Sequence, residues 1–243
     1  MTRIYESCNH ILIRTGHSDP AEHRHMAAHI IISINENMTV LSDGQRFYCR
    51  GIMIPPGIAH SINTHNHPAL VFLYDSTTNV ATQISDIKLL SESDCDRICS
   101  LFSEFEMDGS SHAYLFFEKS LLAMLGLESG CHVTDKRILS AMKKIRYELS
   151  EPLSCRDIAD TVCLSQSRFS HLFRQQVGMT FAAYLVYQRI LYVYTKILAG
   201  SSITEAALES GFSSSTHFAE VNRRVFGLSA SSITKNMIFT KVQ

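Results

Sequence analysis

The sequence predicts an α+β protein, in which a small β-barrel and two helices are followed by a second half made only of helices. Three observations support this fold class. Residues 11–74 consist of short alternating or β-rich runs separated by turn residues. Between about residue 84 and residue 126 the apolar period becomes helical. In the second half, a helix, a short turn and another helix occur twice, offset by 48 residues at the turns and 49 at later core positions.

The strands of the first half are predicted from β-branched and aromatic runs that end at turn signals. Residues 30–34 form the most apolar run, and residues 42–44, Ser-Asp-Gly, are a hairpin signal. Residues 55–57, Pro-Pro-Gly, mark another turn, and the run at 70–74 closes the set. Many short strands at this spacing favour a small barrel or a double-sheet sandwich.

Two helices are expected after the strands, joined by a turn at residues 108–111. The first shows the one-sided apolar stripe of an amphipathic helix. Residues 114–125 are too apolar for a helix with a water-facing side, so another surface must bury them. The barrel wall and a second subunit are the two candidates.

The expected domains are residues 1–128, a linker at 129–134, and residues 135–243. The second domain opens with a basic amphipathic helix over residues 135–149. A long helix over residues 180–199 joins the two repeated helix pairs. Serines start the helices and glycines stop them, as capping chemistry requires. The predicted starts are Ser154, Ser165, Ser202 (with Glu205 completing a capping box) and Ser213 or Ser214, and the predicted stops are Gly178 and Gly227.

An ordered set of residues runs through both copies and the helix between them. With Arg189 and Ile190 in the joining helix, this set resembles the DNA-binding domain of AraC/XylS-type transcription regulators over roughly the last 100 residues. The markers are Leu164, Phe169, Leu172, Phe173 and Gly178 in the first copy, and Ile203, Ala206, Gly211, Phe212, Phe218 and Gly227 in the second.

The sequence departs from that family pattern at three positions. Asn222 stands where a core aromatic residue is usual, and its counterpart in the first copy is Phe173. Glu220 replaces a basic residue, and Ala230 replaces a proline. These departures concern the packing and base preference of the second copy rather than the fold.

The resemblance implies that the second helix of each pair enters the major groove of DNA. Arg168 could pair bidentately with guanine. Arg174 lies further along the same helix and is expected to contact a phosphate. Arg189 has two interpretations, a phosphate contact or a salt bridge to Asp157 or Asp160. The candidate DNA-binding residues are Gln166, Ser167, Arg168, Ser170, His171, Arg174, Ser214, Ser215, Thr216, Glu220, Arg223 and Arg224.

The formal net charge of −1 conceals an asymmetry between the halves. Residues 1–132 hold 8 Lys and Arg against 15 Asp and Glu, a net charge of −7. Residues 133–243 hold 14 against 8, a net charge of +6. A polyanion is attracted to the second half and repelled by the first, which fits a sensor domain followed by a DNA-binding domain.

Two segments of the first half resemble cupin motifs. His23, His25 and His29 follow the first motif with histidine in place of its glutamate, and residues 55–63, which contain His60, follow the second. These four histidines either line a pocket for an organic effector, stabilise loops, or hold a divalent metal, for which imidazole is a suitable ligand. No cofactor is assigned beyond this candidate metal.

Seven cysteines without CxxC spacing indicate reduced thiols in a cytoplasmic protein. Cys95 and Cys99 could share a helix face, which leaves a redox or metal role open. No apolar run reaches the ~18–20 residues of a membrane span.

Taken with the resemblance, these patterns indicate a sequence-specific transcription regulator, an activator rather than a repressor, and not an enzyme. The expected partners are double-stranded DNA, a small-molecule effector or metal ion, RNA polymerase and a second copy of the chain, because the resembling family dimerises through the helices that follow the barrel. Two alternatives remain. One is a metal-dependent cupin enzyme fused to a DNA-binding domain, and the other is a constitutive, ligand-free dimer.

Overall fold

The computed structural model describes residues 2–7, 10–24, 26–226 and 237–242. Met1–Gly130 and Ser231–Gln243 together form one compact unit, and Cys131–Ala230 form the other. The first boundary falls inside the predicted linker at residues 129–134. Residues 231–243, however, group with the first unit and not with the second domain, because the last strand of the chain pairs with the first. We call the two parts the barrel unit and the helical unit.

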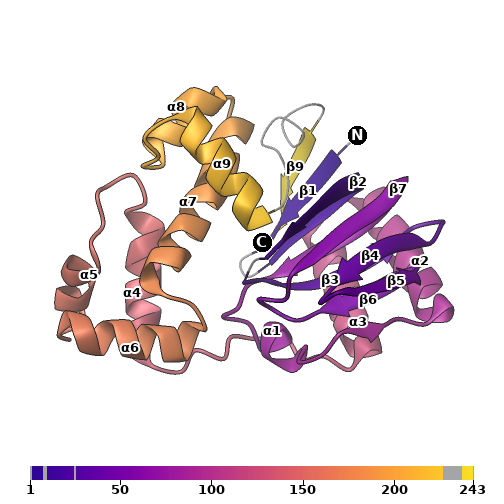
Figure 1. Ribbon diagram of the computed structural model, residues 1–243, viewed down its shortest axis with the longest axis horizontal. Helices are drawn as coiled ribbons and strands as arrows, with labels where there is room; N and C mark the ends of the chain where they lie inside the picture. The colour runs from indigo at the N-terminus through magenta and orange to yellow at the C-terminus, as the bar shows by residue number, and fades with distance from the viewer. Residues whose placement is uncertain (1, 8–9, 25, 227–236, 243) are drawn as a thin grey trace. The chain divides into compact units, whose positions relative to one another are not determined.

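The described residues of the barrel unit contain one nine-stranded sheet in the order β8-β6-β3-β7-β2-β1-β9, with the β4–β5 hairpin attached through β4 to β7 (Figure 1). Its pairs are antiparallel except β1 with β9. This confirms the predicted β-rich first half. The strands are β1 Thr2–Glu6, β2 His10–His23, β3 Ala28–Ser33, β4 Met38–Ser42, β5 Gln45–Cys49, β6 Gly51–Ile54, β7 His60–Tyr74, β8 Lys88–Leu89 and β9 Met237–Lys241.

Local sequence explains the central strands. Every residue of β3, Ala28–Ser33, is buried, as expected for an apolar strand covered on both faces. The predicted hairpin joins β4 to β5, where Asp43 and Gly44 both adopt positive φ, 50° and 73°. Two consecutive left-handed residues form the turn that matches the twist of a tight hairpin.

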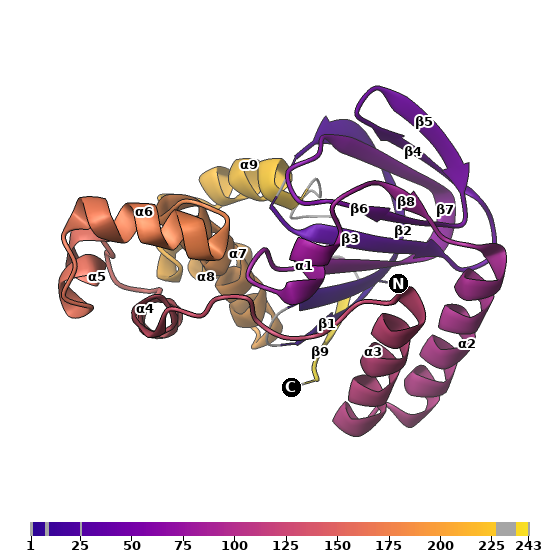
Figure 2. The same ribbon diagram turned by 90° about the horizontal axis from the view of Figure 1, so that it is seen from below.

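A short helix, α1 Asn79–Gln83, precedes the two predicted helices, α2 Glu92–Asp108 and α3 Ser111–Leu125. The side chains of Ser91 and Ser110 cap α2 and α3 by accepting from backbone N–H groups three residues later. The two helices lie side by side (Figure 2) and bury an aromatic stripe against the sheet. The stripe consists of Phe102, Phe105, Tyr114 and Phe117.

Within the described part of the barrel unit, one side of α3 is exposed. Leu115 is 44% exposed and Phe116 is 61% exposed, whereas Tyr114 and Phe117 beside them are buried. The barrel unit therefore buries some, but not all, of the apolar side chains of residues 114–125. It leaves two large apolar side chains in water.

The helical unit contains six helices among the residues that the structure describes. Helices α4 to α6 lie around one end of α7, and α8 and α9 around the other (Figure 1). The predicted stop at Gly227 lies outside the described residues. The helices are α4 Lys136–Tyr147, α5 Cys155–Thr161, α6 Gln166–Val177, α7 Phe181–Leu198, α8 Ile203–Glu209 and α9 Ser215–Phe226.

Within the described ranges, no helix combines the length and the apolar composition that crossing a bilayer requires.

Candidate nucleic-acid interface

The first helix predicted to contact DNA is α6, the second helix of the first pair. The hydroxyl of Ser165 accepts from the backbone N–H of Arg168 at 3.4 Å, and the helix ends at Gly178 in a left-handed conformation. Its inner side buries Phe169 and Phe173, whose ring centroids lie 5.3 Å apart. The opposite side is open to solvent and carries the predicted DNA-binding residues Gln166, Ser167, Arg168, Ser170, His171 and Arg174.

The second helix predicted to contact DNA is α9. The hydroxyl of Ser214 accepts from the backbone N–H of His217 at 3.0 Å, which places the helix start at Ser214 rather than Ser213. Phe218, on the inner side of this helix, is buried. Of the predicted DNA-binding residues here, Ser214 and Ser215 are half-buried, and the exposed ones are Thr216, Glu220, Arg223 and Arg224.

The prediction from sequence missed His217, although the repeat could have found it. An offset of 49 residues places His217 in the second copy where Arg168 stands in the first. Its side chain is exposed, and its Nδ1 lies 3.0 Å from the hydroxyl of Ser213 and accepts from the backbone N–H of Ser213 at 3.4 Å. With Nδ1 held as an acceptor, neutral imidazole carries its proton on Nε2, a hydrogen-bond donor.

Both turns close with the same backbone hydrogen bonds. The N–H of Leu164 donates to the carbonyl of Ala159 at 3.0 Å, and the N–H of Phe212 donates to the carbonyl of Ala207 at 3.0 Å. The residue before each donor is left-handed, Cys163 with φ 57° and Gly211 with φ 82°. Glycine adopts this conformation freely, whereas cysteine does so at a cost.

Asn222 takes the place of a core aromatic residue by forming a hydrogen bond. It is fully buried, and its Oδ1 accepts from the hydroxyl of Tyr194 on α7 at 2.5 Å. In the first copy, the equivalent Phe173 packs edge-on against Tyr184 with ring centroids 5.5 Å apart. The departure at Asn222 therefore changes the kind of contact with α7 but leaves the helix packed.

Arg189 hydrogen-bonds to backbone carbonyls instead of forming the suggested salt bridge. One guanidinium nitrogen donates to the carbonyl of Gly211 and another to the carbonyl of Glu151, each at 3.4 Å. Burial lowers the pKa of this arginine from its usual value. The predicted salt bridge to Asp157 or Asp160 is replaced by hydrogen bonds that join the start of one helix pair to the turn of the other.

Three of the four candidate effector or metal histidines come together in the barrel unit. The ring of His60 lies 4.6 Å from that of His23 and 4.5 Å from that of His29, measured between centroids. Nδ1 of His60 lies 2.8 Å from the carbonyl oxygen of Ile58. His25 lies outside the described residues. Within the part of the chain that the structure describes, no three His, Cys, Asp or Glu side chains are arranged to hold a metal ion.

A second buried polar cluster joins β2 to α3. Nε2 of His10 lies 2.6 Å from the hydroxyl of Tyr114, and Nδ1 lies 3.3 Å from a carboxylate oxygen of Glu118. Burial lowers the pKa of His10 to about 3 and raises the pKa of Glu118 to about 7. Both groups are therefore largely uncharged between about pH 3 and pH 7. Their proximity could not be predicted from the sequence.

The thiols of Cys95 and Cys99 both belong to α2, as their spacing suggested. Burial raises the pKa of Cys95 to about 12 and also raises that of Cys99. The reactive form of cysteine is the thiolate, so these side chains are packing groups at ordinary pH.

Comparison with known proteins places the similarity mainly in the helical unit. A family described as a helix-turn-helix domain matches residues 158–236. The Arabinose operon regulatory protein of Escherichia coli is 33% identical over 101 residues, which are 40% of this chain and 34% of that protein. The Regulatory protein PocR of Salmonella typhimurium is 33% identical over 94 residues, 38% of this chain and 31% of that protein. The chain thus spans about a third of the length of these curated relatives.

Solved structures extend the similarity of fold to both units. Apo ToxT from Vibrio cholerae aligns with a TM-score of 0.60 at 10% identity, over 95% of this chain and 98% of that one. Unsaturated fatty acid bound ToxT aligns with a TM-score of 0.56 at 10% identity, over 96% of this chain and 94% of that one. At this identity the likeness concerns the fold alone: an antiparallel barrel with helices, followed by a helical domain with two helix-turn-helix motifs.

Proposed function

We propose that this chain, whose helix-turn-helix domain resembles the AraC type, is a sequence-specific DNA-binding transcription regulator, and an activator. The observation that carries this proposal is the pair of serine-capped helices, α6 and α9. Each buries a phenylalanine on one side and presents polar and basic side chains on the other. The relatives that match this domain are regulatory proteins, which favours regulation over catalysis.

The two helices are suited to different contacts with DNA. On α6, Arg168 near the helix start can reach guanine O6 and N7, and Arg174 two turns later suits a phosphate. On α9, Thr216 and His217 lie near the start, and Arg223 lies toward the end. The net charge of +6 over residues 133–243 supplies the attraction to the DNA backbone and predicts salt-dependent binding.

The test is selection of duplexes from a random pool with the full chain, followed by affinity measurements. Arg168→Ala should weaken binding to the selected duplex by about 1–3 kcal/mol and relax preference at one base pair. Arg174→Ala is the matched control and should weaken binding to all duplexes alike. If the wild-type chain enriches no sequence, the proposal is wrong. If Arg168→Ala weakens all duplexes equally, Arg168 is a phosphate contact.

We further infer that the barrel unit takes a small effector. Solved ToxT structures of the same fold hold an unsaturated fatty acid or (E)-4-(8-methylnaphthalen-1-yl)but-3-enoic acid. An apolar carboxylic acid is therefore the first class to test, by thermal shift of the full chain and by its effect on binding to the selected duplex. A divalent metal at the histidines is the second class. A chelator that leaves both readouts unchanged would remove it.

The exposed side of α3 supports a homodimer. Leu115 and Phe116 are large apolar side chains in water, and a second copy would cover them. Sedimentation should show a dimer that Phe116→Lys weakens. Tyr48→Lys is the matched control, because Tyr48 is a 69% exposed apolar side chain on β5 and its replacement should leave the dimer intact. A wild-type monomer at all concentrations would refute this part. Contact with RNA polymerase belongs to the activator proposal and is tested by transcription in a purified system.

A further inference from the structure

The helical unit is inserted between two segments of the barrel unit. Cys131–Ala230 lie in the chain between Met1–Gly130 and Ser231–Gln243, which together form one compact unit. Residues 126–135 connect α3 to α4, and residues 227–236 connect α9 to β9. At ~3.3–3.6 Å per extended residue, a connector of this length reaches no further than about 36 Å. The helical unit is thus attached at both ends by short connectors.

The second attachment is a strand in the sheet. β9 pairs with β1 in parallel, with Cα partners from Thr2 and Met237 to Glu6 and Lys241. One residue later, the N–H of Val242 donates to the carbonyl of Glu6 at 3.0 Å. Val242 is 1% exposed and packs in the same core as Tyr5. The pairing therefore combines backbone hydrogen bonds with a buried apolar side chain.

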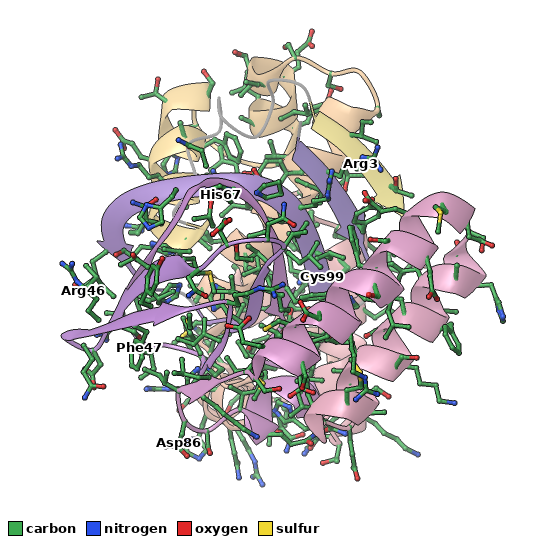
Figure 3. All side chains as sticks on the ribbon, turned by 90° about the vertical axis from the view of Figure 1, so that its right-hand side faces the viewer. Arg3, Arg46, Phe47, His67, Asp86 and Cys99 are labelled. Atoms are coloured by element: carbon green, nitrogen blue, oxygen red, sulfur yellow. The ribbon has the colours of Figure 1, made fainter. Side chains whose placement is uncertain are left out.

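The strand that receives β9 is also tied to α2. Arg3, which is the Cα partner of Ile238 and is labelled in Figure 3, donates to a carboxylate oxygen of Glu106 at 2.7 Å. The hydroxyl of Tyr5 donates to the same oxygen at 3.2 Å. On its other side β1 pairs with β2. β1 therefore contacts β2, α2 and β9 at once, so a movement of β2 or α2 can alter the pairing of β1 with β9.

We propose that Met237–Val242 is a second anchor of the DNA-binding domain, that it docks on the β1 edge of its own chain, and that docking restricts the positions available to the domain. The proposal rests on the proposed function and on its dimer. In a dimer bound at two sites, a domain held at both ends loses less freedom on binding the second site than one held at a single end. Release of the anchor should therefore weaken binding to paired sites and leave single-site binding unchanged.

Hydrogen exchange in the full chain tests the docking directly. Val242→Asp places a charge in the core and should release the strand, so that the amides of Met237–Lys241 exchange faster. Ile238→Asp is the matched control, because Ile238 is 40% exposed on the same strand. A chain ending at residue 236 is a second released form, should Val242→Asp disturb the barrel. Protection that rises with protein concentration would mean that the strand docks on a second copy, which contradicts the proposal.

DNA binding tests the restriction. The probes are a duplex selected by the wild-type chain that contains two sites, and the same duplex with one site scrambled. Both released forms should bind the paired duplex about fivefold or more weakly and the single-site duplex with unchanged affinity. Equal affinities of released and wild-type chains for the paired duplex would overturn the proposal. Loss on both duplexes would show damage to the DNA-binding domain, which also contradicts it. If the wild-type chain selects no sequence, the proposed function is wrong, and so is the proposed restriction of the DNA-binding domain. The hydrogen-exchange result would still decide whether Met237–Val242 docks on β1.

Discussion

Replacing Cys163 by glycine should stabilise the helical unit. Cys163 holds φ 57° in the first turn, while the equivalent position of the second turn is Gly211 with φ 82°. A left-handed residue other than glycine costs roughly 1–2 kcal/mol. Glycine also gains freedom in the unfolded chain, which offsets about 0.4–1 kcal/mol of that relief. Since the Cys163 side chain is exposed and loses little packing, a net gain of about 0.5–1 kcal/mol is expected.

The assay is scanning calorimetry of the full chain, with hydrogen exchange to assign the transition of the helical unit. For a unit of about 100 residues, the expected gain raises Tm by about 2–6 °C. Cys163→Ala is the control, because it removes the sulfur and keeps the left-handed strain. It should change Tm little. A Tm for Cys163→Gly that is equal to or lower than that of Cys163→Ala would show that the left-handed conformation of residue 163 does not destabilise the helical unit.

Three further predictions concern buried or shared polar groups. With the Glu118 pKa raised from 4.5 to about 7 and the His10 pKa lowered from 6.5 to about 3, stability should be greatest between pH 4.5 and 6.5, falling as pH rises through about 7 and as it drops below 4.5. Glu118→Gln should remove the fall at high pH in thermal unfolding, and a parallel profile would contradict this. Tyr194→Phe removes one hydrogen bond to buried Asn222 and should lower the free energy of unfolding in urea by about 0.5–1.5 kcal/mol, and an unchanged free energy would contradict this. Arg189→Ala should lower stability and leave the salt dependence of DNA binding unchanged, whereas a lost phosphate contact would reduce the slope by about 1.

The helical unit could be predicted closely because its signals are local. Ser165 and Ser202 cap α6 and α8 as expected, and the capping box of Ser202 with Glu205 is formed. A cap needs only a side-chain oxygen within three residues of an unpaired N–H, so the sequence itself contains both partners. The positions of the helices follow from their apolar period, and the matching of the two helix pairs follows from the repeat.

Contacts between distant residues could not be predicted in this way. β9 pairs with a strand at the opposite end of the chain, and its residues carry no signal that names β1 as the partner. Asn222 looked like a weakness of packing because its partner, Tyr194, belongs to another helix. For Arg189 the sequence suggests a phosphate contact or a salt bridge, and it does not indicate the backbone carbonyls that accept from this side chain in the fold. In each case, the missing information was which backbone or side chain the fold brings near.

The two helix pairs have the same turn hydrogen bonds but different exposed side chains on α6 and α9. The residues that stabilise the fold are therefore distinct from those proposed to contact DNA. The turn hydrogen bonds are the same in both copies, and Phe169 and Phe218 are buried at matching positions. At matching exposed positions, however, Arg168 corresponds to His217 and His171 corresponds to Glu220. An arginine offers a bidentate fork to guanine, whereas neutral histidine offers one donor and glutamate only accepts. Since the turn hydrogen bonds do not involve these side chains, the two helices can share one backbone geometry and, under the proposed function, prefer different bases.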